Sequence, residues 1–228
     1  MPYFYYDWTM ILVIPGLLLG LYAQFKVKST FARYSRVRTK SGLTAEAAAR
    51  MLLSRGGSTN VTISRVNGSL TDHYDPRSNT LRLSDTVYGS DSVAAVGVAA
   101  HECGHALQEH DGYGLLKLRS ALVPAVNIGS GLYLPIFMAG LLFSWEPLQL
   151  AGILCFALTL LFSLVTLPVE INASKRALGM LEGVLDAEEL QGAKAVLSAA
   201  ALTYLASVIS SALQLLRLIL ISRSRNRD

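Results

Sequence analysis

The chain is poor in cysteine, and its apolar stretches are almost free of charge. Its 2 cysteines are Cys103 and Cys155, and Cys155 lies inside an apolar run, so the pattern indicates no disulfide framework. Within the apolar stretches the ionisable residues are essentially Glu170, at one end, and Arg217, near the last terminus. A pore or transporter needs a polar pathway across the membrane, and this scarcity of charge gives such a pathway little support.

The composition is too apolar for an average soluble domain. Hydrophobic residues make up 52% of the 228 residues, and the mean hydropathy is +0.40. The formal net charge is +4, but the basic residues cluster beside apolar segments. This is typical of signals for membrane topology and not of a nucleic-acid surface. We therefore expect a mostly α membrane protein that contacts lipids and has no nucleic-acid partner.

Four apolar stretches are candidates for transmembrane helices. They are residues 8–25, 122–143, 148–171 and 196–221. The first is expected to be an uncleaved anchor, because residues 1–7 contain no Lys or Arg and no small-residue cleavage site follows. The short turn at residues 144–147 predicts that the second and third stretches form an antiparallel hairpin. Ser and Thr dilute the fourth stretch, so the sequence predicts three to four spans.

The basic residues near these stretches predict the orientation. None precedes the first stretch or lies at the hairpin tip, whereas the first and third stretches are followed by Lys26, Lys28, Arg33, Arg36, Arg38, Lys40, Lys175 and Arg176. The positive-inside rule then places the segment between the first two spans in the cytoplasm. A fourth span would leave Arg223, Arg225 and Arg227 outside, against the rule. The alternative is that the fourth stretch lies in the interface or packs on the soluble part.

The segment His101-Glu102-Cys103-Gly104-His105 has the pattern H-E-x-x-H. On a helix, His101 and His105 lie on one face and can bind one Zn²⁺, with Glu102 as general base. The alternative is an ordinary helix with surface histidines, but the small and apolar run at residues 93–100 indicates a buried helix. A glycine such as Gly104 destabilises a helix interior by about 1 kcal/mol relative to alanine. Close approach of another segment would explain why a glycine occupies this position.

The soluble segment before this motif predicts one helix and a small sheet. Thr44 is the expected N-cap of a helix at residues 45–54, which Gly56 terminates. Three short strands follow, at residues 61–66, 69–74 and 80–84, with turns at Asn67-Gly68 and at residues 75–79. We expect a three-stranded antiparallel sheet. Its outer strand either pairs with an extended substrate or is a purely structural hairpin.

A catalytic zinc site needs a third protein ligand. Among Glu109, His110, Asp111 and Glu170, we favour Glu170, because a carboxylate at the end of an apolar helix is costly unless it is paired or metal-bound. Ser174 lies four residues later, on the same helix face, where it can orient a ligand. The expected parts of the chain are an anchor at 1–25, a cytoplasmic catalytic part at 26–120, a transmembrane hairpin at 121–171, and a cytoplasmic helix followed by an apolar helix with a basic tail at 172–228.

These motifs resemble the YugP-like membrane zinc metallopeptidases, a prokaryotic family. The resemblance covers nearly the whole chain and is carried by residues 70–76, 99–108 and 170–178. More distantly, the chain is similar to the HtpX-type gluzincin peptidases, whose downstream E-x-x-A-D motif supplies the third ligand. Here Glu170 to Ala173 match that motif, and Ser174 replaces its Asp. The resemblance implies a gluzincin-like catalytic part, a substrate-binding edge strand at 70–74 and location in a prokaryotic inner membrane.

The sequence as a whole predicts a zinc-dependent endopeptidase acting at the cytoplasmic membrane surface on protein or peptide substrates, chiefly membrane proteins. The HtpX-type analogy suggests a part in membrane-protein quality control. Candidates for contacting substrate or the developing oxyanion are His73, Tyr74, His110, Arg176 and Tyr204. The alternative is a proteolytically silent, zinc-containing membrane scaffold or adaptor, for which Glu102 would be dispensable.

Overall fold

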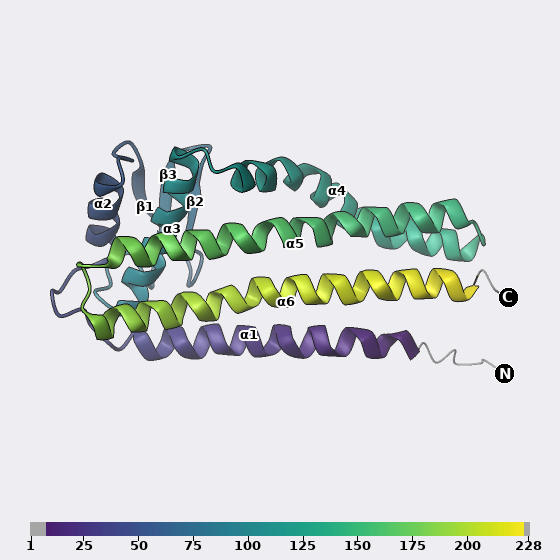
Figure 1. Ribbon diagram of the computed structural model, residues 1–228, viewed down its shortest axis with the longest axis horizontal. Helices are drawn as coiled ribbons and strands as arrows, with labels where there is room; N and C mark the ends of the chain where they lie inside the picture. The colour runs from purple at the N-terminus through teal and green to yellow at the C-terminus, as the bar shows by residue number, and fades with distance from the viewer. Residues whose placement is uncertain (1–7, 226–228) are drawn as a thin grey trace. The chain divides into compact units, whose positions relative to one another are not determined.

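The computed structural model describes residues 8–225 and is mostly helical (Figure 1). Residues 1–7, the start of the predicted anchor, and Arg227, in the predicted basic tail, lie outside the described residues. The helices are η1 (Trp8–Leu12), α1 (Val13–Tyr34), α2 (Ala45–Arg55), α3 (Val93–His110), α4 (Gly114–Leu142), α5 (Glu146–Leu181) and α6 (Ala187–Arg225). Within the described residues, 4 helical segments are long and apolar enough to cross a membrane, and they contain the four predicted stretches except for residue 143, which follows the end of α4. Residues 172–181 continue α5 and do not begin a new helix.

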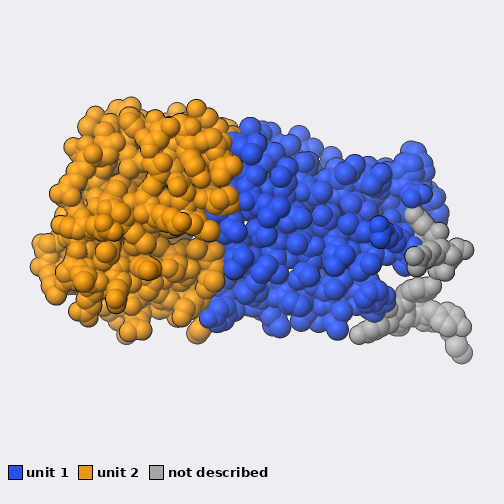
Figure 2. Space-filling model, in the orientation of Figure 1, with its two compact units in different colours: residues 1–23, 118–167, 203–228 blue, residues 24–117, 168–202 orange. Residues whose placement is uncertain are grey.

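The chain divides into two compact units, which Figure 2 colours separately. Unit 1 comprises residues 1–23, 118–167 and 203–228, and unit 2 comprises residues 24–117 and 168–202. Helices α1, α4, α5 and α6 each contribute residues to both units. All the strands, together with α2 and α3, belong to unit 2.

Unit 1 is built from apolar helices that approach closely at small residues. A Cβ added to Gly140 would lie 2.5 Å from the backbone nitrogen of Gln149, and one added to Gly152 would lie 2.7 Å from Phe137 Cβ. These contacts run in opposite directions along α4 and α5, so the two helices are antiparallel. Many large apolar side chains remain exposed, such as Leu142 at 75%. This combination is typical of helices that pack through small residues and present larger ones to lipid.

The sheet differs from the predicted one. Strands β1 (Thr62–Val66), β2 (His73–Asp75) and β3 (Thr80–Ser84) lie in the order β1-β3-β2. Strand β2 pairs with β3 in antiparallel fashion, as predicted from the turn at residues 75–79. Strand β1, however, pairs with β3 in parallel. The prediction of an all-antiparallel sheet with a β1–β2 hairpin at Asn67-Gly68 is therefore wrong.

Hydrogen bonds to the end of β3 explain this difference. The Gly68 N–H donates to Asp85 Oδ2 at 3.0 Å, so the predicted turn residue is tied to β3 instead of reversing the chain. The Asp72 carboxylate accepts hydrogen bonds from the Ser84 backbone N–H at 2.7 Å and from its hydroxyl at 2.9 Å. Leu70 lies between these anchors with φ 57°, a left-handed conformation that interrupts an extended strand. Residues 67–72 therefore form a loop, and β2 begins only at His73.

The core of unit 2 lies where α3 packs against α2. The Thr44 hydroxyl accepts a hydrogen bond from the Ala47 N–H at 3.3 Å, and Gly56 is the C-cap, so both predicted ends of α2 are confirmed. Cys103 is fully buried, and its thiol is 3.7 Å from the Ala49 carbonyl oxygen. Cys103 therefore faces α2 and the core, and this leaves a different face of α3 for the histidines of the motif.

Helices α3 and α5 approach closely at Gly104. A Cβ added there would lie 2.5 Å from the Ala173 carbonyl oxygen, far inside contact distance. The close approach expected from the cost of a glycine in a helix interior is thus present. It brings the backbone of α5 against the turn of α3 that carries the histidines.

Replacing Gly104 with alanine is expected to force α3 and α5 apart, because the new Cβ would meet rigid backbone. We expect the free energy of unfolding to fall by about 1–3 kcal/mol, measured as a lower thermal midpoint of the detergent-purified protein. The matched control is Gly179→Ala in α5, where an added Cβ meets nothing within 4 Å. Equal midpoints for the two variants would contradict the proposed role of this contact.

Candidate metal centre

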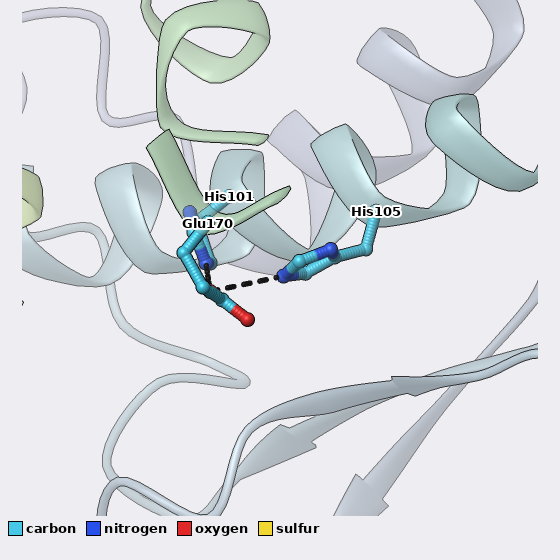
Figure 3. A group of neighbouring side chains, drawn as sticks. All are labelled: His101, His105 and Glu170. Atoms are coloured by element: carbon cyan, nitrogen blue, oxygen red, sulfur yellow. Dashed lines mark hydrogen bonds and ion pairs between the residues drawn. The ribbon is translucent and has the colours of Figure 1, made fainter. Parts of the chain in front are cut away.

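Helices α3 and α5 bring together three side chains that can hold a metal ion (Figure 3). His101 and His105 lie one turn apart on α3, and Glu170 comes from α5. Glu170 Oε2 is 3.2 Å from His101 Nε2 and 3.4 Å from His105 Nε2. One donor atom from each residue lies within 4.8 Å of the other two. Sequence reasoning had named these same three residues.

The donor set and its spacing fit Zn²⁺. Imidazole nitrogen and carboxylate oxygen are its usual ligands, at about 2.0–2.2 Å, and donors at tetrahedral angles around such an ion are roughly 3.3 Å apart. The two distances to Glu170 Oε2, 3.2 and 3.4 Å, agree with that separation. Cys103 is excluded as a ligand because its thiol faces α2. The site therefore offers two nitrogens and one carboxylate group, all from residues in unit 2.

Burial favours a positive charge beside Glu170. The side chains of His101, His105 and Glu170 are only 14%, 12% and 3% exposed. A desolvated carboxylate is costly unless an opposite charge compensates it. Burial alone would lower the pKa of His105, but the hydrogen bond to Glu170 and the charges of Glu102 and Glu170 together raise it above its usual value. The surroundings thus favour positive charge, which a metal ion can supply.

Hydrogen bonds on the far sides of the imidazoles fix how the rings are presented. The Nδ1 atom of His105 is 3.0 Å from Gln108 Oε1, and that of His101 is 3.2 Å from Ser174 Oγ. Because a carboxamide oxygen can only accept, His105 Nδ1 must carry a hydrogen, so Nε2, which faces Glu170, is the ring nitrogen that can bind a metal ion. Ser174, which was expected to orient a ligand, lies where the Asp of the HtpX-type motif would be.

Gln108 is a site residue that sequence reasoning missed. Its side chain is fully buried, and its amide nitrogen donates to the Val169 carbonyl and to Asn172 Oδ1, both at 2.9 Å. These two acceptors fix the orientation of the amide, so its oxygen faces His105. Gln108 therefore connects a histidine of α3 to the residues on either side of Glu170. The only hint in the sequence is its position three residues after His105, which places it one helical turn further on.

Arg176, His73 and Tyr74, which were also predicted, do not belong to the cluster. Arg176 donates from Nε to Asn172 Oδ1 at 3.0 Å and pairs with Asp111, so it supports the Gln108 network from outside. His73 is exposed, with Nδ1 2.9 Å from the Thr71 carbonyl oxygen. The Tyr74 hydroxyl donates to Asn79 Oδ1 at 2.8 Å.

His110 and Tyr204, the other two residues predicted to contact the oxyanion, and Glu102, the predicted general base, do not belong to the cluster either. A Cβ added to Gly57 would lie 3.7 Å from His110 Nε2, so that imidazole lies beside the end of α2. Tyr204 belongs to α6 in unit 1. Glu102 is 8% exposed on α3, and its charge acts on His105.

Gln108→Ala is expected to weaken zinc binding about 10- to 100-fold, because His105 loses its acceptor and the tie between α3 and α5 is cut. Competition with a chromogenic chelator measures the affinity. Glu109→Ala, at the exposed neighbouring position, is the control and should leave the affinity unchanged. If Gln108→Ala folds as stably as the wild type and binds zinc equally well, Gln108 does not position His105.

Comparisons with known proteins place this chain in a family. The family described as "Putative neutral zinc metallopeptidase" matches residues 9–223. The chain is also similar to a protein of Bacillus subtilis (strain 168) described as "Putative membrane protease YugP". The two are 45% identical over 214 residues, which cover 93% of this chain and 95% of that protein. No solved structure matches. The resemblance to the YugP-like membrane zinc metallopeptidases is thus confirmed, and the chain belongs to this zinc metallopeptidase family.

Proposed function

We propose that the protein is a zinc-dependent endopeptidase of the membrane, with its site at the cytoplasmic surface. The observation that carries this proposal is the convergence of His101, His105 and Glu170 from two helices. Glu102 follows His101 on α3, and its charge acts on His105. Structural zinc sites are closed by four protein ligands, whereas catalytic sites have three and leave a position open. In the described part of the chain, no fourth His, Cys, Asp or Glu joins this cluster.

Each residue then has a distinct task. Zinc, when bound, polarises a carbonyl as a Lewis acid and makes water a stronger acid. Glu102 takes a proton from the attacking water and delivers it to the leaving amine. Gln108 and Ser174 hold the imidazoles so that their Nε2 atoms face the metal position. The alternative, a silent zinc scaffold, gives Glu102 no task.

The exposed edge of the sheet is the proposed guide for substrate. Strand β2 is an outer strand, and it packs beside α3, which carries both histidines. An extended peptide can add to such an edge through main-chain hydrogen bonds, which tolerate many side-chain sequences. His73 and Tyr74 lie in β2 and are therefore the proposed flanking contacts. Adding a peptide as a strand beside β2 would bring it toward the metal-binding helix.

The position of Glu170 along α5 supports a site at the membrane surface. Helix α5 begins at Glu146, so Glu170 lies about 36 Å further along its axis at 1.5 Å per residue. This exceeds the hydrocarbon thickness of about 30 Å. Lys175 and Arg176 follow Glu170, as expected for a cytoplasmic helix end. Membrane proteins with extended cytoplasmic segments are the proposed substrates, and membrane-protein quality control is the proposed role.

Glu102→Gln should retain zinc but reduce cleavage of an unstructured protein about 10²- to 10⁴-fold, because an amide cannot accept the proton. The assay compares wild type and variant in detergent, with zinc content measured in both. Equal cleavage would remove Glu102 from the mechanism. If neither protein cleaves although both hold zinc, the scaffold alternative is favoured over the endopeptidase proposal.

Glu170→Ala should lose most bound zinc after dialysis, because two imidazoles alone hold the ion weakly. Metal analysis of the purified protein gives the stoichiometry. Glu182→Ala removes an exposed carboxylate just beyond the end of α5 and should keep the wild-type stoichiometry. Full zinc occupancy in Glu170→Ala would eliminate Glu170 as the third ligand.

A further inference from the structure

Unit 2 also has a groove between α1 and α6, and none of the metal-centre residues lines it. Its volume is about 350 Å³. Helix α1 contributes Lys26, Thr30 and Arg33, which are spaced along one helix face. Helix α6 contributes the small residues Ala195, Ser198 and Ala199. Because these α6 side chains are short, they leave space between the helices, and Thr30 and Ser198 add hydroxyl donors to it.

The groove is cationic and has no internal counter-charge. None of its lining residues is acidic, and no ion pair among the described residues joins Lys26 or Arg33 to a carboxylate. Two other basic residues that follow in the sequence differ in this respect. Arg38 pairs with Asp91, and Lys40 pairs with Asp186. Lys26 and Arg33 therefore have ammonium and guanidinium donors available for an external anion.

The position of the groove along α1 indicates what kind of anion it meets. Phe25, the last residue of the first apolar stretch, is 71% exposed, and Lys26 follows it directly. An exposed apolar helix surface faces lipid chains in a membrane, so Lys26 lies where the chains end and the headgroups begin. The cytoplasmic leaflet carries anionic lipids that attract basic residues at this depth. An amphiphile gains from both Phe25 and the cations, whereas free phosphate gains only from the cations.

We propose that the groove between α1 and α6 binds the phosphate group of an anionic membrane phospholipid. Lys26 and Arg33 contact the phosphate oxygens from either end, and the hydroxyls of Thr30 and Ser198 donate hydrogen bonds between them. Arg33 also lies over the Tyr34 ring, 5.4 Å from its centroid, which limits the freedom of the guanidinium. This lipid site is separate from peptide cleavage and does not depend on it.

Native mass spectrometry of the full-length, detergent-purified protein tests the proposal with phosphatidylglycerol and phosphatidylcholine as probes. The double variant Lys26→Gln/Arg33→Gln should retain phosphatidylglycerol about thirtyfold less well than the wild type. The matched control, Lys28→Gln/Arg36→Gln, removes the same charge from the same region without touching the groove, and should retain the lipid normally. Phosphatidylcholine should bind weakly to all three proteins.

A further variant, Ser198→Leu, fills the groove without changing the charge and should also lose the lipid. Equal loss of phosphatidylglycerol in both double variants would overturn the proposal, because it would show only general attraction to basic residues. The proposal would also be overturned if the wild type retained phosphatidylcholine as well as it retains phosphatidylglycerol. Retention of phosphatidylglycerol by Ser198→Leu at the wild-type level would overturn it too. Displacement of the lipid by millimolar inorganic phosphate would instead assign the groove to free phosphate.

Discussion

The metal centre depends on the close contact between α3 and α5. Gly104 has no side chain, so the Ala173 carbonyl can lie where a Cβ would otherwise be. Only at such a separation can the short carboxylate arm of Glu170 reach both imidazoles of α3. Small residues at a helix contact are common in membrane proteins because they let backbones approach. Here the same device brings ligands from separate segments to one point.

Polar side chains then maintain the register of this contact. Gln108 connects His105 to the Val169 carbonyl and to Asn172, and Arg176 continues the chain of hydrogen bonds to Asp111. Every member of this network has a partner, which is the condition under which buried polar groups stabilise one arrangement. The network surrounds Glu170 and leaves its carboxylate to the metal position. The network therefore holds the three proposed ligands in the arrangement that a metal ion would need.

Local signals in the sequence predicted the helices, the Thr44 cap, and the approach at Gly104. Glu170 was predicted from the cost of a carboxylate at the end of an apolar helix, and the structure places it beside both histidines. The sheet was predicted wrongly because Asp72 and Asp85 bind the end of β3, and no pattern within residues 67–72 encodes those distant partners. Gln108 was missed for the same reason, since its role depends on acceptors in α5.

In the proposed site, two imidazoles and one carboxylate hold the metal and leave a position open. X-ray absorption spectroscopy of the zinc-loaded, full-length protein tests this directly. We expect two histidine nitrogens, further oxygen donors and no sulfur around the zinc, with the oxygen contribution reduced in Glu170→Ala. A sulfur ligand would contradict the proposed site, because Cys103 would then have to leave its place against α2. A spectrum with four histidine nitrogens would contradict it equally, since it would need ligands from outside this site.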